Sequence, residues 1–536
     1  MEKKSSTYKS HDIQNEIASL MANKIVRGMA AKIRNNGYFA IMADETTDVS
    51  NREQLVLCIR WVDEKLTVHE DFLGLYQMDS VKAHDIKNAI IDILLRLDIP
   101  LSNCRGQCYD GCSTMAGERA GVSTAIKEME PKALYTHCYA HALNLACGDS
   151  IKRSKVMKDA LDTTHEITKL VKLSPKRDAA FRTIQTACTD NNPSSVRMLC
   201  PTRWTVRADA MQSIIDNYAA LLSLWEWCLD EYKDTETKAR VQGVASQMGK
   251  FDFFFGLTLG TCLMRHSDTL SSALQSKDLT ASEGQRLAAM TVKTIQKMRT
   301  DEGFMSFWKR TTEAASEKGV APAILPRKVR PPRRIEDCLG GHAEPEFPAF
   351  PESYFKRIYF EAIDLTTNAI TARFDQKDYK VYSLIESLLI KSVAGEESNS
   401  ELEQVVRFFK PDFSLEDLRF QLQILQANYE NSHTLSGLFE HFRAMSSAEK
   451  CLMYQVTKLV KLLMTVPASN ASSERSFSAL RRMKTYLRAT MKQERLNHMM
   501  IAYVHKANMD ALNMTEIAND FVQGNERRMG LFGHFS

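Results

Sequence analysis

The chain has 536 residues, of which 44% are hydrophobic and 25% are charged, and its formal net charge at neutral pH is +4. This length predicts two or three domains with separate cores, and the nearly balanced charge excludes a polycation. The longest apolar stretch, residues 253–264, is too short to span a bilayer. We therefore expect a globular protein without a membrane partner.

The first residues and the cysteines indicate a reducing compartment. Residues 1–12 contain no apolar segment of the secretory type. The twelve cysteines show no dense, regular spacing, which is typical of free thiols. A basic, proline-rich cluster at residues 326–334 is either a nuclear-import signal or a solvated connector. These features predict the cytosol or the nucleus.

The first third of the chain alternates between apolar runs and helical patterns. The sequence predicts strands at residues 38–43, 54–62, 67–78, 104–109 and 134–139, with a helix after the third, fourth and fifth. Three strands in a meander, followed by strands that are reached through helices, give a mixed sheet with helical faces. This order is the layout of an RNase H-like fold. In that layout the first and fourth strands end side by side, so we expect Asp44 and Asp110 to be neighbours.

From about residue 150 to residue 460 the hydrophobic period is helical almost throughout. Residues 311–352 interrupt it with a proline-rich stretch that we expect to be a linker or an exposed loop. A helix over 449–464 follows, and another begins near Ser472 with Glu474 in its first turn, where the helix dipole favours a carboxylate. Its predicted buried stripe is Phe477, Leu480, Met483 and Leu487, and its predicted basic stripe is Arg481, Lys484, Arg488 and Lys492.

Asp44, Asp110 and Glu474 are the candidate site. Three rigidly held carboxylates could hold two Mg²⁺ ions and support phosphodiester chemistry. Each acid also has a structural interpretation, because strand ends favour aspartate in turns and helix starts favour acids. Glu45 and Asp48 are close enough in sequence to take the role assigned to Asp44.

Two shorter motifs accompany the acids. Cys138 and His141 have CxxH spacing with three cysteines nearby, but the ligand pairs are not clean, so we expect structural support of the carboxylates and no zinc site. Arg203 and Trp204 form an Arg-Trp pair. Trp204 is either a core residue or a stacking partner for an extruded base, with Arg203 on a phosphate.

The motifs MADETTD, YDGCSTMAG, HCYAHALNL, CPTRW and SNASSERSFSALRRMK together resemble the hAT superfamily of DNA transposases and the host proteins derived from them. The first third resembles the subgroup fused to TTF-type or MYM-type zinc fingers. Residues 445–510 resemble the hAT C-terminal dimerisation region. No tight Cys/His cluster precedes Asp44, so we expect the chain to lack the zinc-binding DNA-recognition domain with which such proteins usually begin.

The resemblance implies an RNase H-like catalytic domain interrupted by a large all-helical insertion, which accounts for the distance in sequence between Asp110 and Glu474. It implies that Asp44, Asp110 and Glu474 are a DDE triad that binds Mg²⁺ or Mn²⁺, and that Cys138 and His141 form the family's CxxH motif. It also implies that the tryptophan of the Arg203–Trp204 pair helps to stabilise a flipped base. We expect the DNA-binding residues to be Arg203, Trp204, Arg475, Arg481, Arg482, Lys484 and Arg488.

These observations predict five segments: 1–36, an N-terminal helical segment; 37–200, the first part of the catalytic domain; 201–445, the helical insertion; 446–510, the dimerisation region that completes the catalytic fold; and 511–536, a tail. The expected partners are DNA and further copies of the chain, with no small-molecule substrate. The expected location is the nucleus.

Three functions remain open from the sequence. The first is a hAT-type transposase that cuts DNA and joins the excised end to a target. The second is a catalytically silent nuclear protein that uses the scaffold for dimerisation and for protein or DNA binding in transcription regulation. The third, a simple RNase H-type nuclease, is disfavoured by the long helical insertion.

Overall fold

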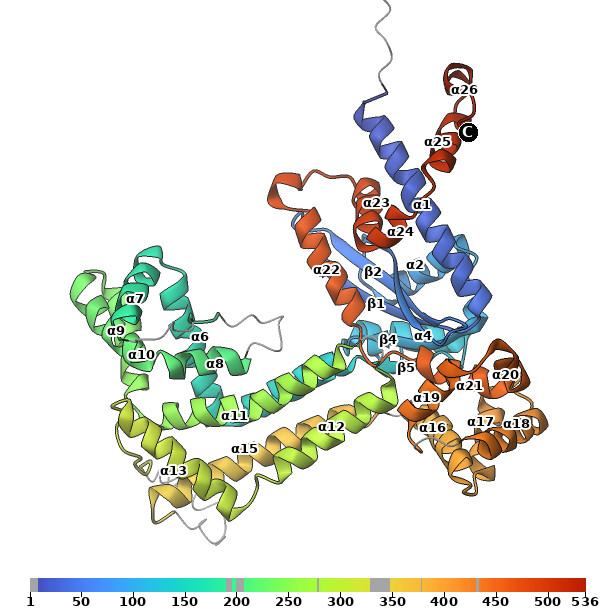
Figure 1. Ribbon diagram of the computed structural model, residues 1–536. Helices are drawn as coiled ribbons and strands as arrows, with labels where there is room; N and C mark the ends of the chain where they lie inside the picture. The colour runs from blue at the N-terminus through green and yellow to red at the C-terminus, as the bar shows by residue number, and fades with distance from the viewer. Residues whose placement is uncertain are drawn as a thin grey trace, which may run out of the picture. The chain divides into compact units, whose positions relative to one another are not determined.

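The structure is a computed structural model that describes residues 8–188, 195–198, 207–276, 279–327, 348–376, 378–429 and 433–536 (Figure 1). It contains two compact units. The first is assembled from three stretches of chain, Met1–Ala142, Leu274–Gln285 and Gln376–Ser536, and the second from Leu143–Ala273 and Arg286–Asp375. The first unit therefore includes residues 274–285 and 376–445, which the sequence assigned to the helical insertion.

A five-stranded mixed sheet lies at the centre of the first unit, as the sequence predicted. The strands, in chain order, are β1 (Phe39–Thr47), β2 (Glu53–Val62), β3 (Val68–Met78), β4 (Cys104–Tyr109) and β5 (Leu134–His137). Their spatial order is β3-β2-β1-β4-β5, with the first three antiparallel and with β1, β4 and β5 parallel. This arrangement confirms the α/β fold with RNase H-like strand order.

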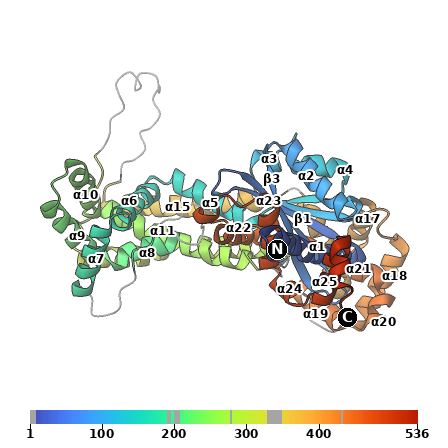
Figure 2. The same cartoon turned by 90° about the horizontal axis from the view of Figure 1, so that it is seen from above.

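Both faces of the sheet are covered by helices, which explains why β1 and β2 are apolar almost without interruption. In Figures 1 and 2, α2 (Ala83–Arg96) and α4 (Val122–Met129) lie on one face. The other face carries α1 (His11–Asn36), α22 (Ala471–Met483) and α23 (Gln493–Val504). The crossovers through α2 and α4 run in the same direction across the sheet, so right-handed connections place both helices on one side.

Helix α1 packs against α25 (Met514–Gln523), which lies close to the end of the chain (Figure 2). Arg528 on α26 (Glu526–Phe532) pairs with Glu16 on α1, with 2.6 Å between Nη2 and Oε2. Lys24 on α1 pairs with Glu516 on α25. The segments 1–36 and 511–536 that the sequence separated are thus joined in space.

The rest of the first unit is helical. It comprises α16 (Tyr379–Ala394), α17 (Asn399–Phe408), α18 (Leu415–Asn428), α19 (Leu435–Ala444), α20 (Ser447–Leu452), α21 (Tyr454–Thr465) and α24 (Lys506–Asp510), with short turns α3 (Ser113–Ala116), η1 (Leu101–Asn103) and η3 (Tyr486–Arg488). The single helix predicted at 449–464 is two helices that break at Met453, whose φ and ψ are −111° and 44°. A capping box between Ser446 and Glu449 starts the first of them.

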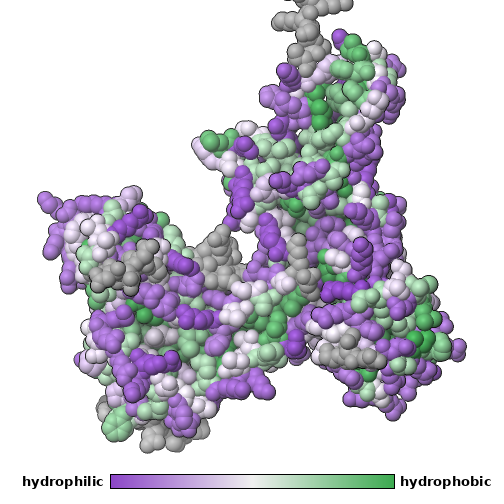
Figure 3. Space-filling model, viewed as in Figure 1, coloured by the Kyte–Doolittle hydropathy of each residue, from purple (hydrophilic) through white to green (hydrophobic). Residues whose placement is uncertain are grey.

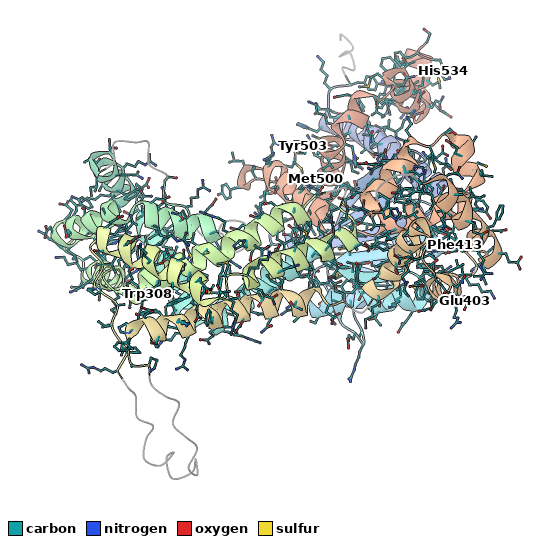
Figure 4. All side chains as sticks on the ribbon, turned by 60° about the horizontal axis from the view of Figure 1, so that its bottom comes forward. Trp308, Glu403, Phe413, Met500, Tyr503 and His534 are labelled. Atoms are coloured by element: carbon teal, nitrogen blue, oxygen red, sulfur yellow. The ribbon has the colours of Figure 1, made fainter. Side chains whose placement is uncertain are left out.

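The regular secondary structure in the described part of the second unit is all helical. Its helices are α5 (Tyr139–Arg153), which begins in the first unit, α6 (Lys155–Lys172), α7 (Pro175–Cys188), α8 (Arg207–Asp216), α9 (Tyr218–Glu231), α10 (Thr235–Met248), α11 (Phe251–Leu274), α12 (Ala281–Gln296), α13 (Asp301–Glu317) and α15 (Pro351–Phe374). Aromatic rings join α11, α13 and α15, with 4.7 Å between the centroids of Phe255 and Phe355. Trp308, labelled in Figure 4, belongs to this cluster.

The predicted linker is shorter than expected. Residues 311–317 belong to α13 and residues 351–352 to α15, because each helix continues its apolar stripe into the proline-rich stretch. Residues 328–347, which include most of the basic cluster, lie outside the described residues.

Candidate active site

The parallel pairing of β1 with β4 brings Asp44 and Asp110 together. The last paired residues are Met42 and Cys108, and each aspartate lies two residues farther along its strand. Because side chains alternate between faces, both aspartates point to the same side at the same edge, on strands about 4.8 Å apart. The predicted adjacency of the two strand ends is confirmed.

One detail of the prediction was wrong. Strand β1 does not end at Asp44 but continues to Thr47, and Asp44 pairs with Val56 on β2. Only the pairing with β4 stops before Asp44, because β4 ends at Tyr109. Asp44 is therefore held by β2 on one side and open on the side of Asp110.

The turn after β4 is shaped by packing as well as by its Asp-Gly sequence. Asp110 Oδ1 accepts a hydrogen bond from the amide of Cys112 at 3.3 Å, and Tyr135 Oη donates to the carbonyl of Asp110 at 3.0 Å. A Cβ atom at Gly111 would lie 2.5 Å from Cε1 of His137. Any side chain at position 111 would therefore require the His137 ring to move.

A hydrogen bond brings Glu474 to the same edge: it joins Asn470, which precedes the helix of Glu474, to Ala43, which precedes Asp44. The Asn470 side chain donates from Nδ2 to the carbonyl of Ala43 at 2.7 Å. The Asn470 amide donates to Sγ of Cys138 at 3.2 Å. Helix α22 starts at Ala471, so Glu474 lies in its first turn, as predicted.

The charges of the three acids interact. Burial raises the pKa of Asp44 well above its usual range, and the neighbouring carboxylates of Glu474 and Asp110 raise it further. Burial also raises the pKa of Glu474, from 4.5 to about 7, although Arg475 acts in the opposite direction. A pair of carboxylates in this setting stays ionised most easily with a cation beside it.

The donor set fits a hard divalent cation in its chemistry, since it consists of carboxylate oxygens whose ionised form a cation would favour. Among the described residues, no three His, Cys, Asp or Glu side chains converge as they stand on a single metal position. The three acids therefore lie close enough for their charges to interact, but their side chains do not converge on a single metal position.

Asp48 and Glu45, the two alternatives to Asp44 as a metal-binding residue, have different surroundings. Asp48 is fully buried and forms an ion pair with Lys484, with 2.5 Å between Oδ2 and Nζ. It therefore has no carboxylate oxygen to offer at the edge of the sheet. Glu45 is partly buried, and burial followed by the charges of Asp110 and Glu53 raises its pKa.

Cys138 connects the segments that carry the acids. Its amide donates to the carbonyl of Tyr109, the last residue of β4, at 3.0 Å, and its sulfur accepts from Asn470. His141 lies beside His137, with ring centroids 5.8 Å apart. Cys138 thus has the geometry expected of a supporting residue.

Helix α22 packs on the sheet through small residues rather than through the predicted stripe. Its buried residues are Ala471, Ser473, Ser476, Ala479 and Leu480. Of the predicted stripe only Leu480 is buried, and Leu487 is 90% exposed because the helix ends at Met483. The small side chains let α22 approach the sheet closely.

The predicted DNA-binding residues divide into three groups. Four of them are exposed: Arg475, Arg481, Arg482 and Arg488. Arg482 donates to the hydroxyl of Tyr503 at 3.2 Å, and Tyr503 is labelled in Figure 4. Lys484 contradicts the prediction, because its side chain is 1% exposed and committed to Asp48. Arg203 and Trp204 lie outside the described residues.

Two supporting groups were missed from the sequence. Arg60 on β2 pairs with Glu70 on β3 at 2.9 Å and donates to the Met464 carbonyl at 3.1 Å, while Ser472 donates to Glu70. An arginine inside the apolar run QLVLCIRWV was the available signal, since buried arginines require partners. Asn470 has the residue type of a helix cap, but its side chain binds β1 and does not cap α22.

The raised pKa of Glu474 predicts a pH dependence of stability. A carboxyl whose pKa is higher in the folded state stabilises that state fully below pH 4.5, and this contribution is lost as the pH rises through about 7. Metal-free protein should therefore lose stability across this window, and Glu474→Gln should flatten the loss. Urea unfolding in EDTA between pH 4 and pH 8 measures it. The same dependence of stability on pH in the wild type and in Glu474→Gln would contradict the raised pKa of Glu474.

Three segments match known protein families. Residues 1–121 match the ZMYM1/FAM200 RNase-like domain, residues 136–245 match the ZBED1 RNase-like helical domain, and residues 449–507 match the hAT family C-terminal dimerisation region. These matches, in this order along the chain, confirm the resemblance to the hAT superfamily that the sequence motifs indicated.

Curated relatives extend the similarity over most of the chain. The human protein named "52 kDa repressor of the inhibitor of the protein kinase" is 22% identical over 518 residues, which cover 92% of this chain and 65% of the relative. Its mouse counterpart is 23% identical over 500 residues, covering 88% and 63%. The chain thus spans slightly less than two thirds of the length of these relatives. Within the described residues, no helix is both long and apolar enough to cross a membrane.

Proposed function

We propose that this protein carries out metal-dependent DNA strand cleavage and transfer on a hAT transposase scaffold. The observation that carries the proposal is the placement of Asp44 and Asp110 at one edge of two adjacent parallel strands, with Glu474 tied to the same edge through Asn470. Carboxylates in this arrangement suit a reaction in which negative charge develops on phosphate oxygens.

In the proposed reaction the three acids would hold Mg²⁺ or Mn²⁺. When bound, the metal ions would supply an activated water or 3′-hydroxyl and stabilise the leaving oxygen. Asp44 and Asp110 would be fixed by their strands, and Glu474 would complete the set from α22. Cys138 and Asn470 would keep the three segments in register through the hydrogen bonds described above.

The proposed DNA contact is the exposed tip that follows α22. No acidic residue occurs between positions 475 and 492, and the tip carries Tyr486 and Leu487, which are 87% and 90% exposed. Figure 3 shows a small hydrophobic end on this tip with hydrophilic residues below it. Exposed arginines beside an aromatic and an aliphatic side chain suit phosphate contacts next to an unstacked base.

The tip is anchored to the turn between β1 and β2. Lys484 pairs with Asp48, Ser50 donates to the carbonyl of Ala489 at 2.8 Å, and Gln493 exchanges hydrogen bonds with Gln54 at 3.0 Å. Because this turn continues the strand that carries Asp44, the proposed DNA contact and the proposed catalytic edge are held by the same structure. Lys484 would thus support the interface without touching DNA.

Dimerisation and nuclear location form part of the proposal. The match to the hAT dimerisation region supports a homodimer, and exposed apolar side chains in this region, Leu452, Tyr503 and Val504, suit a self-complementary interface. The human and mouse relatives are named as repressors, which favours a second candidate. We propose as this alternative a catalytically silent nuclear protein that uses the scaffold for dimerisation and for protein or DNA binding in transcription regulation.

Purified protein is expected to nick hairpin-forming DNA with Mg²⁺ or Mn²⁺ and to stop when EDTA is added. The matched control is Glu474→Gln, prepared in the same way, which should not nick because it lacks one of the three carboxylates. Cleavage that persists in EDTA or in the variant would assign the activity to a contaminant. A wild-type protein that binds DNA, is folded and never nicks would favour the repressor alternative.

A further inference from the structure

A second candidate site lies at the other end of β1. A cavity of about 450 Å³ opens beside Tyr38, between the end of α1 and helices α20 and α21. Tyr38 precedes the first residue of β1, and Asp44 lies six positions farther along the extended chain, which corresponds to about 20 Å. The cavity is therefore distinct from the candidate active site.

Three lysines line this cavity: Lys450, Lys458 and Lys461. The Lys458 ammonium donates to the backbone carbonyl of Asp412 at 2.9 Å and lies over the rings of Tyr38 and Phe413, 5.2 and 5.4 Å from their centroids. Figure 4 labels Phe413. Lys458 is thus held in place by a carbonyl and two aromatic rings, which stabilise its positive charge without neutralising it.

The carboxylate of Asp412 is already engaged by other cations. Arg105 approaches it at 2.7 Å and Lys132 at 3.2 Å. Glu64 also lines the cavity; its charge and that of Asp63 act on Lys461, and its backbone carbonyl accepts a hydrogen bond from Lys450 at 3.4 Å. The cavity therefore gathers three ammonium groups without forming a salt bridge to any of them in the described part of the chain.

The positions of Lys458 and Lys461 are electrostatically costly. Burial lowers the pKa of both Lys458 and Lys461, and the nearby charges of Asp412, Glu64 and Asp63 only partly offset it. Burying a charge without a paired opposite charge is unfavourable. A multivalent anion inside the cavity would supply the missing charge.

We propose that this cavity binds a small phosphate-bearing anion of nucleotide size. Lysine ammonium groups recognise phosphate oxygens as point charges, three lysines line this cavity, and its volume lies within the range of small-molecule sites. The 52% exposed ring of Tyr454 at the rim offers a surface on which a base or another ring can stack. A ligand must enter the cavity to contact the partly buried ammonium groups. A small anion can enter, whereas the backbone of a DNA duplex cannot.

Cys451 gives a direct readout of occupancy. It lines the cavity, and it is exposed, whereas the other free cysteines of the described residues are buried or partly buried. A bound anion should slow the alkylation of this thiol. Mass spectrometry of the Cys451 peptide reports this position separately from every other cysteine.

The test uses the full chain in EDTA, with tripolyphosphate and ATP as probes. Both should bind in calorimetry and slow Cys451 alkylation, and Lys458→Met/Lys461→Met should weaken binding at least tenfold because two charge-assisted contacts are lost. The matched control is Lys65→Met, which removes an exposed lysine that does not line the cavity. Its affinity should equal that of the wild type.

Several outcomes would overturn the proposal. Neither probe binds, the double variant binds as tightly as the wild type, or a DNA duplex protects Cys451 while tripolyphosphate does not. Protection that rises with protein concentration alone would assign the cavity to a second copy of the chain. If the double variant fails to fold, alkylation of the wild-type protein decides the question by itself.

Discussion

Asp44→Asn is expected to abolish metal-dependent strand cleavage while making the metal-free protein more stable. Asparagine keeps the oxygen that accepts the Glu45 amide at 3.0 Å, so the strand geometry is preserved. The substitution removes a negative charge from a position where burial and the carboxylates of Glu474 and Asp110 raise the pKa. Losing about 4 kcal/mol of the stabilisation that bound metal supplies corresponds to about a thousandfold slower cleavage.

The two effects have opposite signs, which separates a metal site from a structural role. A structural aspartate would lose stability and activity together on substitution. Initial cleavage rates with Mn²⁺ and urea unfolding in EDTA measure the two quantities on the same preparations. Asp92→Asn is the matched control, because Asp92 is exposed on α2 and pairs with Arg96, and it should change neither. An Asp44→Asn protein that cleaves like the wild type would exclude Asp44 from the site.

Lys484→Met is expected to destabilise the protein by about 3–5 kcal/mol, which is the usual cost of leaving one member of a buried ion pair without its partner. The side chain of Asp48 is 0% exposed and that of Lys484 is 1% exposed. Asp48 also accepts hydrogen bonds from the Ser50 amide at 2.7 Å and from Gln54 at 2.9 Å. The uncompensated carboxylate would remain inside this polar cluster.

The pH dependence of this pair has a definite sign. Burial raises the pKa of Asp48, but the hydrogen bonds from Lys484, Ser50 and Gln54 outweigh burial, so the pKa lies below its ordinary value of 3.8. The stabilisation is therefore present above pH 3.8 and is lost as the pH falls through the lower folded value. The penalty of Lys484→Met should accordingly shrink in strong acid.

Urea unfolding at pH 7 and in acid measures this penalty. Lys492→Met is the matched control, since Lys492 is exposed in the same loop, and a surface change of this kind usually costs less than about 0.5 kcal/mol. The double substitution Asp48→Asn/Lys484→Met should recover part of the loss. Equal stability of the Lys484→Met and Lys492→Met proteins would show that Lys484 is not a buried partner of Asp48.

The central sheet could be predicted because short segments of the sequence specify its strands. Apolar runs such as residues 38–43 define strands by composition and length, and the order of strands and helices restricts the topology through right-handed crossovers. That topology alone makes Asp44 and Asp110 neighbours. Glu474 was recognisable as a residue in the first turn of a helix, but its link to the sheet through Asn470 was not.

The errors share one cause. Lys484 has the sequence spacing of an exposed basic residue, yet it is buried because Asp48, far away in the chain, lies beneath it. Leu487 has the spacing of a buried residue, yet it is exposed because α22 ends four residues earlier. The break at Met453 likewise follows no signal in the apolar stripe. Hydrophobic periodicity indicates which face of an isolated helix is apolar. It does not indicate where the helix ends or which other elements pack against it.

The sequence by itself determined the fold class, the family relationship and the identities of the candidate acids, because these depend on residue type, order and short-range pattern. Only the tertiary structure decided that Asp48 is paired with Lys484, that Asn470 is the residue through which Cys138 contacts the segment carrying Glu474, and that three lysines line a cavity at the opposite end of β1. Those features arise from contacts between residues hundreds of positions apart. Such contacts are set by the packing of whole elements, and local pattern does not encode them.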